Sequence, residues 1–140
     1  MKLTPYERTA HYYETDQMAI IHHSNYIRWF EEARIDYMEK MGFSYKRMED
    51  AGVMIPVLEV SCQYKSMVRF GDTVVITPNI TEYTGTRLSI SYTVHDKNTG
   101  ELMTLGTSKH CFMKRGGRVG SLKKLLPEAH EAFLAAVNKG

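Results

Sequence analysis

The chain has 140 residues, of which 43% are hydrophobic and 24% charged, and its formal net charge is +2. This length fits a single domain spanning residues 1–140. Dispersed basic residues at so small a net charge argue against a nucleic-acid-binding surface. No apolar run of about 18 residues predicts a membrane span, and the N-terminus lacks the apolar core of a secretory signal. We therefore expect a cytoplasmic protein with no membrane partner.

A long helix is the main element predicted in the first third of the chain. Residues 5–13 are rich in Tyr and Thr and predict a first strand. From Asn25 to Met41, apolar residues recur at spacings of three and four, which predicts a helix with one wide apolar face. Ser24 is the predicted N-cap and Gly42 the predicted C-terminal stop. A face that wide requires a large partner surface, such as a sheet.

The remainder of the chain predicts a short helix, a sheet and a final helix. Residues 44–51 form the short helix, and alternating apolar residues predict half-buried strands at 58–64, around Val74 and Ile76, at 88–94 and at 102–113. Turns at 84–86 and 97–100 are too short for parallel crossovers, so the last three strands form an antiparallel meander. A helix follows from Pro127 to about Asn138. The expected class is α+β, with a five-stranded antiparallel sheet beside one long helix.

The sequence TDQMAIIHHSNY, residues 15–26, allows three interpretations: a reactive centre, a metal site, or an ordinary helix start. If the segment is an ordinary helix start, Ser24 or Asn25 caps free backbone N–H groups, and Asp16 is a turn residue. If it is a reactive centre, those N–H groups and the helix dipole hold an oxyanion. Asp16 then acts as nucleophile or general base on a carbonyl placed between them. A thioester suits this chemistry because its thiolate leaves without a strong general acid.

The metal interpretation is the weakest of the three. His22 and His23 are adjacent, so we expect their rings to diverge, unlike two histidines spaced by four on a helix. The remaining histidines, His11, His95, His110 and His130, have no ligand spacing and are interpreted as structural. Cys62 and Cys111 are far apart and outside any CxxC pair, which predicts free thiols.

Three segments together resemble the hotdog-fold acyl-CoA thioesterases of the 4-hydroxybenzoyl-CoA thioesterase family. They are Tyr13-Glu14-Thr15-Asp16, Ile20 to Tyr26, and Trp29-Phe30-Glu31-Glu32-Ala33-Arg34. Weaker likeness continues through Arg69-Phe70-Gly71-Asp72 and the turn at Thr99-Gly100, up to about residue 120. The resemblance implies a long helix wrapped by a curved sheet, assembly into homodimers or homotetramers with acyl sites at the dimer interface, and thioester hydrolysis without a cofactor.

The resemblance also assigns expected roles to individual residues. Asp16 matches the family's catalytic aspartate, and His23 matches the position whose backbone N–H faces the thioester oxygen. The expected substrate-binding residues are Ile21, His22, Asn25, Tyr26 and Arg69. Position 19 departs from the family pattern, because Ala replaces the usual Gly and its methyl restricts positive φ. No metal ligand is expected.

Two alternatives to an acyl-CoA thioesterase remain open at this point. Ala19 is the one specific feature in favour of a non-catalytic acyl-thioester-binding protein. A hotdog dehydratase is also compatible with the fold, since one fold serves several chemistries. Candidate contacts for the CoA phosphates, chosen by charge, are Lys65, Arg69, Lys109, Lys114, Arg115 and Arg118. Trp29 and the edge strands predict surface that needs a second subunit.

Overall fold

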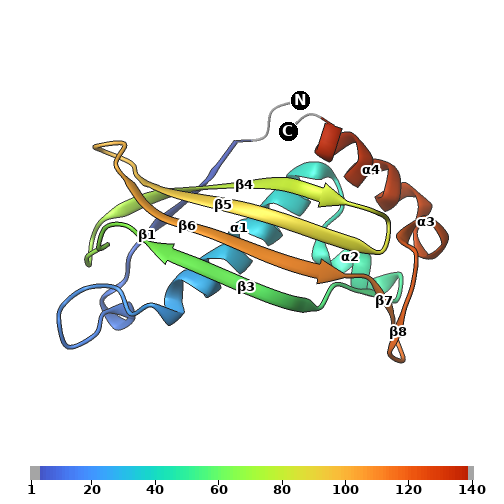
Figure 1. Ribbon diagram of the computed structural model, residues 1–140, viewed down its shortest axis with the longest axis horizontal. Coiled ribbons are helices and arrows are strands. Elements are labelled where there is room, and N and C mark those ends of the chain that lie inside the picture. Colours follow the sequence, from blue (N-terminus) through green and yellow to red (C-terminus); the bar gives the residue numbers. More distant parts are fainter. Residues whose placement is uncertain (1–3, 139–140) are drawn as a thin grey trace.

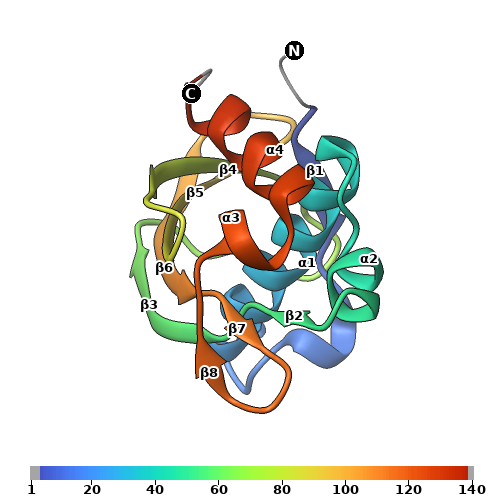
Figure 2. The ribbon, with the colours of Figure 1, turned by 90° about the vertical axis from the view of Figure 1, so that its right-hand side faces the viewer.

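A curved sheet of five antiparallel strands wraps around one long helix in the computed structural model, which describes residues 4–138 (Figures 1 and 2). The predicted α+β class is confirmed, as is the meander of the last three long strands, which pair in sequence order. In spatial order the sheet consists of β1 (Tyr6–Thr9), β4 (Thr73–Tyr83), β5 (Arg87–Asp96), β6 (Leu102–Cys111) and β3 (Val57–Tyr64).

The helix inside this sheet, α1, runs from Ser24 to Met41. Its buried face carries apolar side chains at the predicted spacings: Tyr26, Trp29, Phe30, Ala33 and Met38. Gly42 ends the helix at φ 96°, and its N–H donates to the Glu39 carbonyl at 3.0 Å. Glycine adopts this left-handed conformation without a Cβ clash, which is why the helix stops there. Trp29 is fully buried, so it does not supply the exposed surface that the sequence predicted.

The start of α1 differs from the prediction. Ser24 is the first helical residue, and His23 occupies the N-cap position without a side-chain cap bond. Nδ1 of His22 accepts the Ser24 N–H at 3.2 Å, and so performs the capping that was expected of a serine hydroxyl. The Asn25 side chain does not cap either, because it donates to the distant Glu14 carbonyl.

The first strand is shorter than the predicted 5–13. β1 ends at Thr9, and the chain then forms a 3-10 helix at Tyr12–Glu14. The carboxylate of Glu14 accepts the His11 N–H at 2.9 Å and turns the backbone away from the sheet. A side chain that bonds its own backbone three residues away competes with strand pairing, and here it prevails.

Strand β3 lies at an edge of the sheet and is more exposed than the alternation predicted. Val60 and Cys62 are half-buried, whereas Leu58 and Tyr64 are about half exposed. Beyond it a small second sheet, absent from the prediction, joins β2 (Val53–Met54), β7 (Met113–Lys114) and β8 (Arg118–Val119). The predicted strand 102–113 is divided between β6 and β7, with Phe112 buried between them.

The other helices pack around one end of the sheet (Figure 2). They are α2 (Tyr45–Asp50), α3 (Leu122–Leu125) and α4 (Pro127–Asn138), of which α3 was not predicted. Ser44 caps α2 by accepting the Arg47 N–H at 3.1 Å. Tyr83 of β4 stacks on Phe133 of α4 and attaches that helix to the sheet. No helix within residues 4–138 is long and apolar enough to cross a membrane.

Candidate active site

The loop that precedes α1 forms a tight turn around Asp16. The Asp16 N–H donates to the Ile20 carbonyl at 2.8 Å, and the Ala19 N–H donates to the Asp16 carbonyl at 3.1 Å. Oδ1 of Asp16 accepts the Met18 N–H at 2.7 Å, which fixes the carboxylate. Ala19 has φ 64°, so the loop reaches the left-handed conformation despite the methyl group. The concern that Ala19 would prevent this geometry is therefore removed.

Neighbouring segments hold this turn in place on both sides. Ile20 forms a bridge with Arg69, and the Ile21 N–H donates to the Val68 carbonyl at 2.8 Å. The His22 N–H donates to the Glu14 carbonyl, also at 2.8 Å. The turn thus has fixed attachments to the segment before β4 and to the 3-10 helix.

A pocket of about 240 Å³ lies between this turn, the start of α1 and the segment that follows β3. Its lining consists of Asp16, Ile20, Ile21, His23, Tyr26, Tyr64, Lys65, Ser66 and Met67. The pocket therefore brings together four of the expected site residues, Asp16, Ile21, His23 and Tyr26. His22, Asn25 and Arg69 do not line it. Asn25 is buried against the Glu14 carbonyl, and the Arg69 side chain is exposed at the surface.

The amide of His23 differs from its neighbours at the helix start. The N–H groups of Asn25 and Tyr26 donate to the His22 and His23 carbonyls, and the Ser24 N–H donates to the His22 ring. Among the hydrogen bonds of residues 4–138, the His23 N–H has no acceptor. Unpaired N–H groups were expected at this helix end, and the structure leaves this one on a residue that lines the pocket.

The two adjacent histidines do not diverge as expected. Their rings stack, with centroids 4.2 Å apart, and Nδ1 of His22 lies 2.9 Å from the Ser24 hydroxyl. That bond holds the His22 ring over the first turn of α1, beside its neighbour. Within the described part of the chain, no cluster of three or more His, Cys, Asp or Glu side chains could hold a metal ion.

Two tyrosines form the aromatic wall of the pocket. Tyr26 is buried, and its ring meets that of Tyr64 edge to face at 5.0 Å. The Tyr64 hydroxyl donates to the His23 carbonyl at 3.2 Å, which links the end of β3 to the helix start. Burial raises the pKa of Tyr64 to about 12, so this hydroxyl stays protonated at neutral pH.

Comparison with known proteins identifies the family. Residues 11–137 match a family model described as the thioesterase-like superfamily. The chain belongs to this superfamily. This thioesterase-like protein is 34% identical over 134 residues to the Bacillus subtilis (strain 168) protein named "Putative acyl-CoA thioesterase YneP", across 95% of the chain and 96% of that protein.

Solved structures agree with this assignment. The crystal structure of a DHNA-CoA thioesterase from Staphylococcus aureus superposes with a TM-score of 0.91 at 34% identity, covering 97% of this chain and 93% of that one. An Aquifex aeolicus protein of known structure superposes with a TM-score of 0.84, also at 34% identity, covering 91% and 97%. The predicted hotdog thioesterase fold is confirmed.

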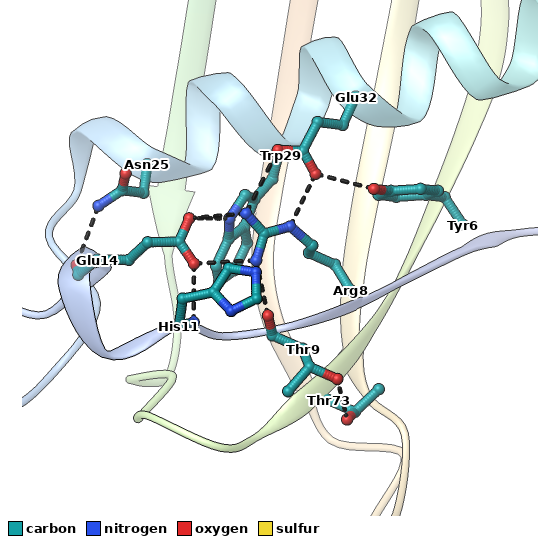
Figure 3. A network of polar contacts seen from close by, with 9 residues as sticks. All are labelled: Tyr6, Arg8, Thr9, His11, Glu14, Asn25, Trp29, Glu32 and Thr73. Carbon is teal, nitrogen blue, oxygen red and sulfur yellow. Dashed lines mark hydrogen bonds and ion pairs between the residues drawn. The ribbon is translucent and has the colours of Figure 1, made fainter.

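Sequence reasoning missed the polar cluster around the buried Glu14, which lies beside the Asp16 loop of this thioesterase (Figure 3). We call it the Glu14 cluster: Glu14, Arg8, Trp29, Glu32 and Tyr6. Glu14 is 3% exposed, and its carboxylate accepts bonds from the Arg8 guanidinium and the Trp29 indole. Burial opposes its ionisation, but the His11 amide, Trp29 and Arg8 outweigh burial and hold the pKa of Glu14 below its usual range. One signal was present in the sequence: a Trp on the buried face of a helix needs an acceptor for its N–H.

Proposed function

We propose that this protein hydrolyses an acyl-CoA thioester to a free carboxylic acid and CoA, with the thioester carbonyl bound between the Asp16 carboxylate and the His23 N–H. The observation that carries the proposal is that Asp16 and an unpaired helix-start amide belong to the same pocket. Membership of the thioesterase-like superfamily and the likeness to proteins named acyl-CoA and DHNA-CoA thioesterases support it.

Asp16 has one oxygen available for chemistry in this proposal. Oδ1 accepts the Met18 N–H, and we assign the reaction to the other oxygen, Oδ2. As a nucleophile, it bonds to the carbonyl carbon, and collapse of the tetrahedral oxyanion breaks the C–S bond to give a mixed anhydride that water then cleaves. As a general base, it takes a proton from water while the water oxygen bonds to the carbonyl carbon. Both routes release CoA as a thiolate, which solvent protonates.

The His23 N–H stabilises the negative oxygen that forms in either route. One such oriented donor lowers the barrier by about 3 kcal/mol in a water-poor site. Because it is a backbone group, its direction depends on the loop and helix geometry rather than on the histidine ring. The His23 side chain contributes to the pocket wall beside it.

The rest of the pocket suits an acyl group bound inside it, with the charged CoA part of the substrate lying outside the pocket. Ile20, Ile21, Tyr26 and Met67 supply apolar surface for the acyl chain. Lys65 is the one lysine or arginine in the lining, so we assign it to the phosphates of CoA ahead of the other basic candidates.

A homodimer completes the proposal. Strand β3 has no partner on its outer side within the described sheet, and exposed apolar side chains lie on it or just before it: Met54, Val57, Leu58 and Tyr64. An unprotected edge beside apolar surface favours pairing with a second copy. Tyr64 also lines the pocket, so a copy at this edge would adjoin the reaction site.

The decisive experiment measures thiol release from a panel of short, long and aromatic acyl-CoAs, DHNA-CoA included, by the wild type and variants of Asp16. We expect Asp16→Asn and Asp16→Ala to lower kcat by about a hundredfold or more on the best substrate, because a positioned acid–base group contributes at least that factor.

The matched control is Asp36→Asn, since Asp36 lies on α1 and pairs with Lys40 outside the pocket. It should retain wild-type kcat. Full activity in both Asp16 variants would show that the assignment of Asp16 is wrong. Tight binding of acyl-CoA without thiol release would support a non-catalytic binding protein, and loss of water from a 3-hydroxyacyl thioester would support a dehydratase.

A further inference from the structure

The Glu14 carboxylate is saturated with hydrogen-bond donors (Figure 3). Oε1 accepts the His11 N–H at 2.9 Å and Nη1 of Arg8 at 3.0 Å. Oε2 accepts the Trp29 indole N–H at 2.8 Å and Nη2 of Arg8 at 3.0 Å. A two-pronged arginine bond with two further donors fixes both the position and the rotation of the carboxylate. The side chain of Glu14 therefore joins β1 to the first turns of α1.

The backbone carbonyl of the same residue makes two more bonds in the opposite direction. It accepts the His22 N–H at 2.8 Å and the buried side-chain amide of Asn25 at 3.0 Å. Glu14 thus contacts β1 and the second turn of α1 through its side chain, and the start of α1 through its main chain. It lies where the two ends of the Asp16 loop meet.

The proposed reacting groups are direct neighbours of these anchored atoms. Asp16 follows Glu14 by two residues, and His22, whose amide Glu14 holds, immediately precedes His23. Because the His22 N–H is committed to the Glu14 carbonyl, the orientation of the next peptide, which carries the free His23 N–H, is restricted as well. A shift of Glu14 would move the carboxylate and the oxyanion donor relative to each other.

We propose that Glu14 is a positioning residue for thioester hydrolysis. It holds the Asp16 loop against the start of α1 so that Asp16 and the His23 N–H both contact the same thioester carbonyl. This inference depends on the proposed function. Glu14 does not line the pocket, so it acts through Asp16 and His23 and does not touch the substrate.

Glu14→Gln is the sharpest variant, because Gln keeps the shape but offers one oxygen to four donors. At least two of these donors would then face an NH2 group, and the local geometry must change. We expect kcat to fall by about tenfold or more with KM within about twofold, since a displacement of about 1 Å near a reaction centre costs up to a hundredfold in rate.

Glu32→Gln is the matched control. Glu32 bonds to the same arginine, with 2.8 Å between Arg8 Nε and Glu32 Oε1, but within residues 4–138 it forms no hydrogen bond with the Asp16 loop or with Glu14. Like Glu14→Gln, this variant removes one negative charge beside Arg8, but it leaves the Asp16 loop untouched. We therefore expect kcat to stay within about threefold of the wild type. If Glu14→Gln does not yield folded protein, Arg8→Lys tests the same point, because it retains the charge and loses the two-pronged bond.

The double variant Asp16→Asn/Glu14→Gln separates positioning from a general structural role. If Glu14 sets the position of Asp16 relative to the His23 N–H, Glu14→Gln should lower the residual rate of Asp16→Asn by a clearly smaller factor than it lowers the wild-type rate, because coupled groups are not additive. An equal loss in both backgrounds would show that Glu14 has only a structural role and would overturn the inference.

Wild-type kcat in Glu14→Gln, beside an inactive Asp16→Asn, would overturn the inference about Glu14 and leave the proposed function intact. A wild type that releases no thiol from any acyl-CoA would refute both.

Discussion

Ala19 holds a backbone conformation that most L-residues avoid. Its φ of 64° lies in the left-handed region, where Cβ approaches the following carbonyl oxygen at a cost of about 1–2 kcal/mol. Among residues 4–138, it is the one non-glycine residue with positive φ. The bonds from the Asp16 N–H to Ile20 and from the Ala19 N–H to Asp16 hold it there. Backbone strain of this kind is typical of functional sites, where the surrounding structure holds a residue in an unfavourable conformation.

Ala19→Gly should therefore raise the free energy of unfolding by about 0.5 kcal/mol and leave kcat unchanged. Relief of the Cβ strain exceeds the entropy that glycine adds to the unfolded chain, which is about 0.4–1 kcal/mol. Urea unfolding checks this. Gly42→Ala is the reverse control, because Gly42 has φ 96° with open space where a Cβ would lie, and it should lose about 1 kcal/mol. A less stable Ala19→Gly would show that the strain is absent.

At the scale of elements, α1 packs closely against strand β6. The ring of Phe30 stacks on Tyr92 of β5 with centroids 4.5 Å apart, and it lies directly over Gly106 of β6. A Cβ at position 106 would overlap two ring atoms of Phe30. Glycine is needed there for space rather than for backbone freedom, and it lets the sheet approach the helix.

Gly106→Ala should lower the free energy of unfolding by about 1–3 kcal/mol, the usual cost of overpacking a dense core. Phe30 is fully buried, so its ring has nowhere to move. The double variant Phe30→Leu/Gly106→Ala tests the cause, because a smaller side chain makes room for the added methyl. Its total loss in urea unfolding should be less than the sum of the two single losses. Strict additivity would rule out the clash.

At the scale of the whole molecule, a buried polar path crosses the layers. Arg34 of α1 donates to the Tyr92 hydroxyl at 3.1 Å, that hydroxyl lies 2.7 Å from Ser108 Oγ, and Ser108 Oγ lies 2.7 Å from Nε2 of His110. Burial, followed by the charge of Arg34, lowers the pKa of His110 to about 4. His110 is therefore neutral in the folded protein across the pH range where the unfolded chain would protonate it.

Acid should destabilise the fold through this histidine between pH 6.5 and 4. In that window the unfolded state binds a proton that the folded state excludes, so stability falls as the pH falls, by up to about 3 kcal/mol. Urea unfolding at pH 7 and pH 4.5 measures the loss. In His110→Gln, which cannot titrate, the loss between the two pH values should be smaller by about 2 kcal/mol. Equal losses in both proteins would place the acid sensitivity elsewhere.

The exposed edge at β3 also belongs to this scale. We expect sedimentation to give a dimer or tetramer of the 16.1 kDa chain. Leu58→Asp should shift it towards the monomer, because a buried unpaired charge opposes association, and thiol release should fall in parallel if the pocket needs the second copy. A protein that is monomeric at working concentration with full activity would contradict the shared-interface proposal.

The four expected residues that line the pocket could be predicted from the sequence because they lie in one short segment, whereas residues 64–67 of the lining come from the end of β3 and the segment after it. Asp16, Ile21, His23 and Tyr26 lie within eleven residues, and the period of the following segment predicts a helix whose start supplies N–H groups. The sequence did not predict which amide stays free. That depends on the His22 ring, which bonds the Ser24 N–H, and on the Glu14 carbonyl, which takes the His22 N–H.

By itself, the sequence determined the long helix, the antiparallel meander and the acid before the helix, because hydrophobic period and turn length are local properties. Only the tertiary structure decided that Glu14 is a buried anchor with Arg8 and Trp29, that β1 ends at Thr9, and that β3 lies at an open edge. The physical reason is that a buried carboxylate or an unpaired strand edge is defined by partners distant along the chain. Pairings of that kind form only when the sheet closes around α1.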